Sequence, residues 1–142
     1  MTLILDASMA LSWLLKRKDP DEAAQSRQAL DVVRSSGAMV PALWFPEVAN
    51  TLLLAERQRV IATEESANFL FSLSVWSIAQ DTVLPASCQA QVIHLARIHK
   101  LTAYDATYLE LAMRRAATLA TFDRKLAAAA RNAGVRVFGD AG

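Results

Sequence analysis

The 142-residue sequence is poor in cysteine, glycine and proline, and each shortage excludes a class of protein. Its single cysteine, Cys88, allows no internal disulfide and no cysteine-rich metal site, so we expect a reducing compartment. Four glycines and four prolines exclude a collagen-like or low-complexity chain. No run approaches the roughly 18 apolar residues of a membrane span, and the first residues lack the basic segment of a signal peptide. We therefore expect a soluble, cytoplasmic protein without a membrane partner.

Charge of either sign is also scarce. Fifteen Lys and Arg residues stand against fourteen Asp and Glu residues, so the formal net charge is +1. A nucleic-acid-binding domain usually has a strongly basic balance, which this chain lacks, although charge segregated on the surface leaves that function open. Hydrophobic residues make up 54% of the chain, which excludes a disordered protein and suits a single domain over residues 1–142.

Short apolar runs alternate along the chain with longer stretches of helical pattern. We expect strands at residues 3–5, 38–40, 77–83, 118–122 and 135–138, and helices at residues 7–15, 22–35, 45–57, 63–73, 85–99, 104–115 and 123–132. This alternation is typical of a parallel sheet that helices cover on both faces. The sequence therefore predicts an α/β fold with a central parallel sheet of four or five short strands.

Four acidic residues stand where predicted strands end or predicted helices begin. Asp6 and Asp123 each follow a strand and precede a helix, and Glu47 lies in the first turn of the helix after the second strand. In an open parallel sheet the strand ends of one polarity face one edge, where ligands bind. We therefore expect these three acids at that edge. Asp105 follows no predicted strand and is placed there only because it begins a helix.

Helix capping is the competing interpretation of these acids, because Asp is a favoured cap and acids suit the first helical turn. A cap, however, makes no demand on its neighbours in space. Four carboxylates at one apolar edge would repel one another unless a cation lay between them. Carboxylate and water oxygens suit Mg²⁺ or Mn²⁺, whereas the scarcity of His and Cys argues against zinc. The pattern thus favours a divalent-cation site.

Three polar residues near the acids have the chemistry to support such a site. Ser8 is two residues after Asp6, and Thr121 is two residues before the last of the four acids, so either hydroxyl could bond a carboxylate or a metal-bound water. The alternative for each is a bond to its own backbone. Asn50 lies three residues after Glu47 on the same helix face and could orient it or reach substrate; a solvated Asn is the alternative.

A negatively charged substrate would need basic side chains to hold it. Arg124 and Lys125 are the best candidates because they adjoin Asp123. Residues 16–18 and 114–115 are further basic clusters. The competing interpretation is that each cluster is a solvated helix end, where cations are favoured in any case.

Four segments resemble, in order, the motifs of PIN-domain nucleases: residues 3–8, 46–50, 102–109 and 119–126. Each motif alone is weak, but four in order along nearly the whole chain are specific. The compact length and the spacing of Glu47 and Asn50 look most like VapC-type toxins of bacterial toxin–antitoxin pairs. The resemblance implies a three-layer α/β/α PIN-like fold.

The resemblance also implies a metal-dependent endoribonuclease with catalytic residues Asp6, Glu47, Asp105 and Asp123, and with Thr121 as a supporting hydroxyl. We expect Asp6 and Asp105 to hold Mg²⁺ or Mn²⁺ directly. We expect Glu47 and Asp123 to hold it directly or through water. A homodimer and a small cognate antitoxin that blocks the site are the implied protein partners, and RNA is the implied substrate.

Two alternative functions remain open at this point. A metal-dependent phosphatase-like enzyme on a similar sheet would carry an acid two residues after Asp6, and the presence of Ser8 there counts against it. A non-catalytic interaction module on the same fold would use the acids only as helix caps. The positions of the carboxyl groups in space distinguish these possibilities.

Overall fold

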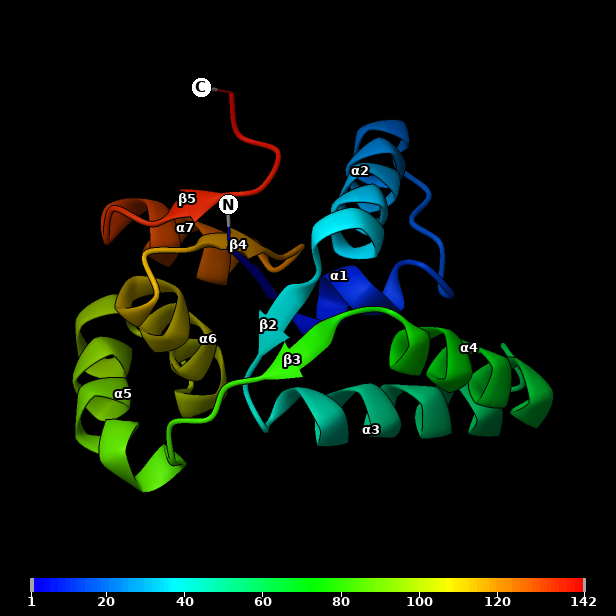
Figure 1. The fold of residues 1–142 in the computed structure, drawn as a ribbon, viewed down its shortest axis with the longest axis horizontal. Helices are drawn as coiled ribbons and strands as arrows, with labels where there is room; N and C mark the ends of the chain where they lie inside the picture. Colours follow the sequence, from blue (N-terminus) through cyan, green and yellow to red (C-terminus); the bar gives the residue numbers. More distant parts are fainter. Residues whose placement is uncertain (1, 142) are drawn as a thin grey trace.

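The computed structural model describes residues 2–141 and contains an all-parallel sheet with the strand order β3-β2-β1-β4-β5 (Figure 1). The strands are β1 (Leu3–Leu5), β2 (Ala38–Val40), β3 (Ile78–Gln80), β4 (Thr118–Ala120) and β5 (Arg136–Val137). All four strand pairings are parallel. The predicted α/β class with a parallel sheet of four or five short strands is confirmed, with five strands.

Within residues 2–141, seven helices connect these strands. They are α1 (Ala7–Leu11), α2 (Pro20–Ser36), α3 (Trp44–Arg57), α4 (Thr63–Val75), α5 (Pro85–His99), α6 (Ala103–Arg114) and α7 (Arg124–Asn132). The chain runs outward from β1 through β2 to β3, with α1 to α4 on one face of the sheet, and returns to β4 and β5 with α5 to α7 on the other (Figure 1). This arrangement gives the predicted three layers and follows from crossovers of one hand.

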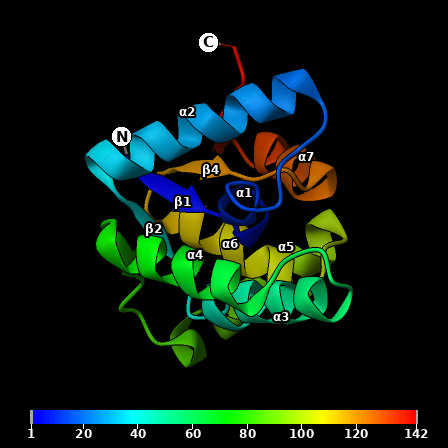
Figure 2. The same cartoon turned by 90° about the vertical axis from the view of Figure 1, so that its right-hand side faces the viewer.

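The first helix is shorter than predicted, ending at Leu11 instead of residue 15. The hydroxyl of Ser12 donates to the carbonyl of Met9 and lies 2.6 Å from the hydroxyl of Ser26 in α2. These bonds turn the chain out of the helix toward α2. As a result α1 lies between α2 and α3 and packs on both (Figure 2), and the basic residues 16–18 lie in the connecting loop rather than at a helix end.

The predicted strand at residues 118–122 ends at Ala120. The backbone N–H groups of Phe122 and Asp123 donate to the side-chain hydroxyls of Ser8 and Thr121, both at 3.0 Å, so they are not available to a strand partner. The same polar side chains that mark the edge of the sheet therefore set the end of the strand.

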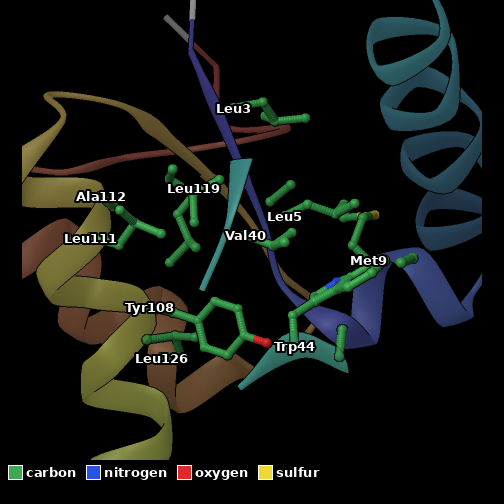
Figure 3. Close-up of a cluster of buried hydrophobic side chains, with 14 of the residues drawn as sticks. Leu3, Leu5, Met9, Val40, Trp44, Tyr108, Leu111, Ala112, Leu119 and Leu126 are labelled. Carbon is green, nitrogen blue, oxygen red and sulfur yellow. The ribbon is translucent and has the colours of Figure 1, made fainter. Parts of the chain in front are cut away.

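The core lies between β1 and β4 and the helices on either side. Ile4 and Leu5 of the central strand β1 and Leu119 of its neighbour β4 are fully buried. From α6, Tyr108 enters the same cluster, with its ring in the core and its hydroxyl turned toward the start of α3, where Trp44 lies (Figure 3). Among the described residues, no helix has both the length and the apolar composition needed to cross a membrane.

Candidate active site

The sheet order places a ligand site between β1 and β4. The chain leaves β1 toward one face of the sheet and leaves β4 toward the other, and this change of direction opens a crevice at the carboxyl ends of the two strands. Leu5 pairs with Ala120 at the end of the ladder. Asp6 directly follows β1 and Thr121 directly follows β4, so the two residues lie side by side at this edge.

Asp6 is 6% exposed and is held by side-chain hydroxyls. It occupies the cap position of α1, yet its side chain makes no capping hydrogen bond. Its Oδ2 instead accepts hydrogen bonds from Ser8 Oγ at 2.7 Å and from Thr121 Oγ1 at 2.6 Å. Both hydroxyls use the same oxygen, so neither occupies Oδ1. Helix capping does not account for this carboxylate.

The two hydroxyls are themselves oriented by the backbone. Ser8 Oγ accepts a hydrogen bond from the N–H of Phe122, and Thr121 Oγ1 accepts one from the N–H of Asp123. Each hydroxyl has one proton, and because its backbone partner donates, that proton is free to go to the carboxylate. The local backbone bond and the bond to Asp6 therefore coexist in both residues.

Of the other three acids, only Asp123 caps a helix, accepting a hydrogen bond from the N–H of Leu126 at 2.9 Å. The cap of α6 is Thr102, whose hydroxyl accepts the N–H of Asp105. Glu47 lies in the first turn of α3, and its Oε1 accepts a hydrogen bond from the hydroxyl of a buried tyrosine that comes from the opposite face of the sheet. Three of the four acids, Asp6, Glu47 and Asp105, thus have side chains that cap no helix.

That tyrosine is Tyr108 of α6, which was not among the site residues predicted from the sequence. It lies three residues after Asp105, so the two residues share one side of α6. This spacing is the signal by which the sequence could have identified it. The hydrogen bond from Tyr108 fixes the position of Glu47 relative to α6.

All four carboxylates line one cavity of about 370 Å³. The remainder of its wall comes from α1, the loop after α1, and α3: Ala7, Ser8, Leu11, Ser12, Leu15, Arg17 and Thr51. The cavity brings together acids from the ends of two strands and the starts of two helices, as the edge of a parallel sheet requires. It also includes Asp105, which the sequence could place there only from its helix start.

The carboxylates influence one another electrostatically. Burial raises the pKa of Asp6, and the charge of Asp123 raises it further, whereas hydrogen bonds from Thr121 and Ser8 lower it. The pKa of Asp105 is raised by burial and by the charges of Asp123 and Asp6. Burial and the repulsion between neighbouring carboxylates both disfavour the ionised forms of Asp6 and Asp105. A cation bound between the carboxylates would offset this effect.

The pKa of Glu47 is likewise raised by burial and by the charges of Asp6 and Asp105, while the hydrogen bond from Tyr108 opposes the shift. The pKa of the Tyr108 phenol is also raised, by burial and by the neighbouring carboxylates. Tyr108 therefore stays protonated and remains a donor to Glu47 at every physiological pH.

The donors on the cavity wall fit a hard divalent cation. They are carboxylate and hydroxyl oxygens, without an imidazole or thiol among the wall residues. Within residues 2–141, no group of three or more Asp, Glu, His or Cys side chains is arranged to hold a metal ion by itself. The wall supplies carboxylate oxygens of the kind that Mg²⁺ binds, one or two at a time, together with water.

Other predicted residues lie outside the cavity wall. Asn50 is exposed on α3, and Thr51 is the residue that lines the cavity one turn after Glu47. Arg124 and Lys125 are exposed at the start of α7, where the charge of Lys125 lowers the pKa of Asp105.

Arg114 is occupied within the fold. It pairs with Asp81 at 2.6 Å and with Glu110 at 2.9 Å, so the suggestion that it holds a nucleic-acid strand is not supported. Arg17, one of three basic residues in the loop after α1, lies on the cavity wall.

Solved structures of similar fold span almost the whole chain. PAE2754 from Pyrobaculum aerophilum has a TM-score of 0.66 at 19% sequence identity, covering 97% of this chain and 90% of its own. FitAcB from Neisseria gonorrhoeae has a TM-score of 0.63 at 20% identity, with 97% of each chain covered. A structure of FitAB bound to an IR36 DNA fragment has a TM-score of 0.54 at 21% identity, covering 96% and 94%. At these identities the likeness shows the fold.

A search of the curated proteins found no match. The model of the PIN domain family matches residues 3–132, a segment that contains all five strands except the last and all seven helices, as well as the four carboxylates of the cavity. The resemblance identified from the sequence motifs is thereby confirmed at the level of the family. The chain belongs to the PIN domain family.

Proposed function

We propose that this protein is a metal-dependent endoribonuclease that acts as the VapC-type toxin of a toxin–antitoxin pair. The observation that carries the proposal is the buried carboxylate of Asp6, which caps no helix and shares one cavity with Glu47, Asp105 and Asp123. Membership of the PIN domain family supports nuclease chemistry at this cavity. The sequence resemblance to VapC-type toxins supports RNA as the substrate.

Asp6 and Asp105 are the proposed direct ligands of Mg²⁺ or Mn²⁺, and Glu47 and Asp123 are proposed to act directly or through water. When bound, the cation supplies positive charge to a phosphoryl oxygen and lowers the pKa of water, which makes a nucleophile accessible near neutral pH. The cation also offsets the charge of the cavity, because four carboxylates repel the phosphates of an approaching strand.

The remaining site residues are proposed to orient these groups. Ser8 and Thr121 hold Oδ2 of Asp6 in one position. Tyr108 holds one oxygen of Glu47 in the same way. Outside the cavity, Arg124, Lys125 and Asn50 are proposed to contact the RNA strand from exposed positions beside the acids.

The proposed protein partners are a small antitoxin and a second copy of the chain. Apolar side chains exposed on α4 offer a contact surface, with Phe71 at 71% and Val75 at 64% exposure. A second apolar region is a cavity of about 810 Å³ between the β3–α5 loop, α5 and α6. An exposed apolar area of this kind typically marks an interaction site.

The proposal is tested with the purified chain, freed of any partner, on RNA. We expect cleavage with Mg²⁺ or Mn²⁺, none with a chelator, and none by the Asp6→Asn variant, whose fold is checked by circular dichroism. Asp31→Asn, an exposed acid on α2, is the matched control and should cleave like the wild type. Cleavage that survives both the chelator and the Asp6→Asn substitution would refute the proposal.

A further inference from the structure

One cation faces the acidic cavity. Within residues 2–141, Arg17 is the single Lys or Arg on the cavity wall. Its neighbours Lys16 and Lys18 carry the same charge in the same loop, yet both are exposed and neither lines the cavity. The structure thus singles out one residue from a basic run that the sequence alone cannot resolve.

Arg17 is held over an aromatic ring. Its guanidinium carbon lies 4.4 Å from the centre of the ring of Phe122, within the range of a cation–π interaction. Glu22 of α2 approaches Nη2 at 3.4 Å, a long contact to one of five N–H donors. In the described part of the chain this is the only side-chain hydrogen bond made by the guanidinium. The stack fixes the position of the group and leaves most of its donors unused.

Both supports of the stack are anchored. The loop that carries Arg17 is tied to α2 at its start, where the indole N–H of Trp13 donates to the carbonyl of Ser26 at 2.9 Å. Its end is fixed by the Asp19 side chain, which caps α2. On the other side, the backbone N–H of Phe122 donates to the hydroxyl that holds the buried Asp6. The guanidinium is therefore positioned relative to the acids and is not a free surface group.

We propose that Arg17 is a substrate-positioning residue that binds a phosphate of the RNA strand beside the scissile bond, with Phe122 as its platform. A planar guanidinium donates two parallel hydrogen bonds to phosphate oxygens, which a lysine cannot do. The acids repel the strand at the centre of the cavity, so a fixed cation on the wall is needed to hold the adjoining phosphate. The weak contact to Glu22 is given up when phosphate binds. This inference rests on the proposed function.

The first test is steady-state cleavage of a short RNA in Mg²⁺ at several salt concentrations. For Arg17→Ala we expect KM to rise about ten-fold, the effect of losing a charge-assisted hydrogen bond, with kcat unchanged. The salt dependence of KM should also become shallower, by about 0.7 in a double-logarithmic plot for one lost phosphate contact on a single strand. Lys16→Ala and Lys18→Ala remove the same charge from the same loop and should alter KM much less.

Further variants separate positioning from structure. Arg17→Lys keeps the charge without the planar fork, and Phe122→Leu keeps an apolar side chain without the aromatic face, so both should give KM values between wild type and Arg17→Ala. Glu22→Gln removes the competing carboxylate and should leave KM unchanged or lower it. A purely structural ion pair predicts the opposite: Arg17→Ala and Glu22→Gln would lower the melting temperature alike and leave KM and its salt dependence unaltered.

The outcomes distinguish the two proposals. If the wild type cleaves RNA and Arg17→Ala keeps the wild-type KM and salt dependence, or changes them no more than Lys16→Ala does, the role of Arg17 is wrong and the proposed function stands. If the wild type cleaves no RNA with either metal, the proposed function fails and takes this inference with it.

Discussion

The hydrogen bond between Tyr108 and Glu47 offers the sharpest test of the site, because it joins α6 and α3 across the sheet. Tyr108 is fully buried, and its ring packs in the core, so Tyr108→Phe keeps the ring and removes one oxygen. The substitution leaves the half-buried carboxylate of Glu47 without its donor. Tyr104→Phe is the matched control, since Tyr104 is on the same helix but is 64% exposed.

The expected size follows from the kind of bond that is lost. A hydrogen bond to a charged acceptor contributes about 1.5–3 kcal/mol, and part of that loss is recovered because phenylalanine has no hydroxyl to bury. We therefore expect Tyr108→Phe to lower the free energy of unfolding by about 1–2 kcal/mol at neutral pH. For a chain of this length that corresponds to a melting temperature lower by roughly 3–8 °C.

The loss should depend on pH in one direction. Tyr108 lowers the pKa of Glu47 by stabilising its ionised form, against the larger effect of burial. The stabilisation is therefore present where Glu47 is ionised and declines as the pH falls below its pKa, so the two proteins should converge in acid. In the metal-free protein, thermal unfolding at pH 7.5 and pH 4.5 measures this, and Glu47→Leu, which removes the acceptor, completes a double-mutant cycle. Equal stability of Tyr108→Phe and Tyr104→Phe at neutral pH, or no coupling in the cycle, would refute the reasoning.

Three further predictions concern the site and the core. Thr121→Val removes a donor to the buried carboxylate and should raise the Mg²⁺ concentration needed for half-maximal cleavage by about 10–100-fold, whereas Thr118→Val, at a buried position in the adjoining strand β4, should not; equal effects would contradict the role of the hydroxyl. Asp105→Asn should raise the melting temperature in chelator at pH 7. The pKa of Asp105 is raised above its ordinary 3.8 in the folded state, so the wild type loses stability as the pH rises through the folded pKa. The difference in melting temperature between Asp105→Asn and the wild type should therefore vanish near pH 4. Leu119→Ala should cost about 2–5 kcal/mol in urea unfolding, since Leu119 is fully buried in β4; a loss below about 1 kcal/mol would contradict the described core.

The fold was largely predictable because its strands are short, apolar and clearly bounded. The run at residues 3–5 is fully buried and ends at a carboxylate, and residues 38–40 lie between Gly37, which has a φ of 79°, and Pro41. What the sequence could not determine was how far α1 extends. Its residues up to Leu15 are good helix formers, but the hydroxyl of Ser12 bonds to α2, a contact that depends on tertiary structure.

The candidate site was predictable only in part. Parallel-strand geometry correctly brought Asp6, Glu47 and Asp123 to one edge, because it depends only on where the strands end. The side chains that contact these acids were harder to find. In the sequence, Tyr108 has the pattern of an ordinary core aromatic residue, and only the structure shows its hydrogen bond to Glu47. Arg17 belongs to a run of three basic residues, and only the structure shows that its guanidinium lies over the ring of Phe122.

The hydrogen bonds also separate acids that the sequence could not. Asp123 stabilises the start of α7, so its substitution damages a helix as well as the cavity. Asp6 caps nothing, and α6 is capped by Thr102 rather than by Asp105. Replacing either of these two by Asn removes a charge from the cavity without removing a helix cap. Loss of cleavage in those variants can therefore be attributed to lost chemistry, whereas the same loss in an Asp123 variant cannot until its stability has been measured.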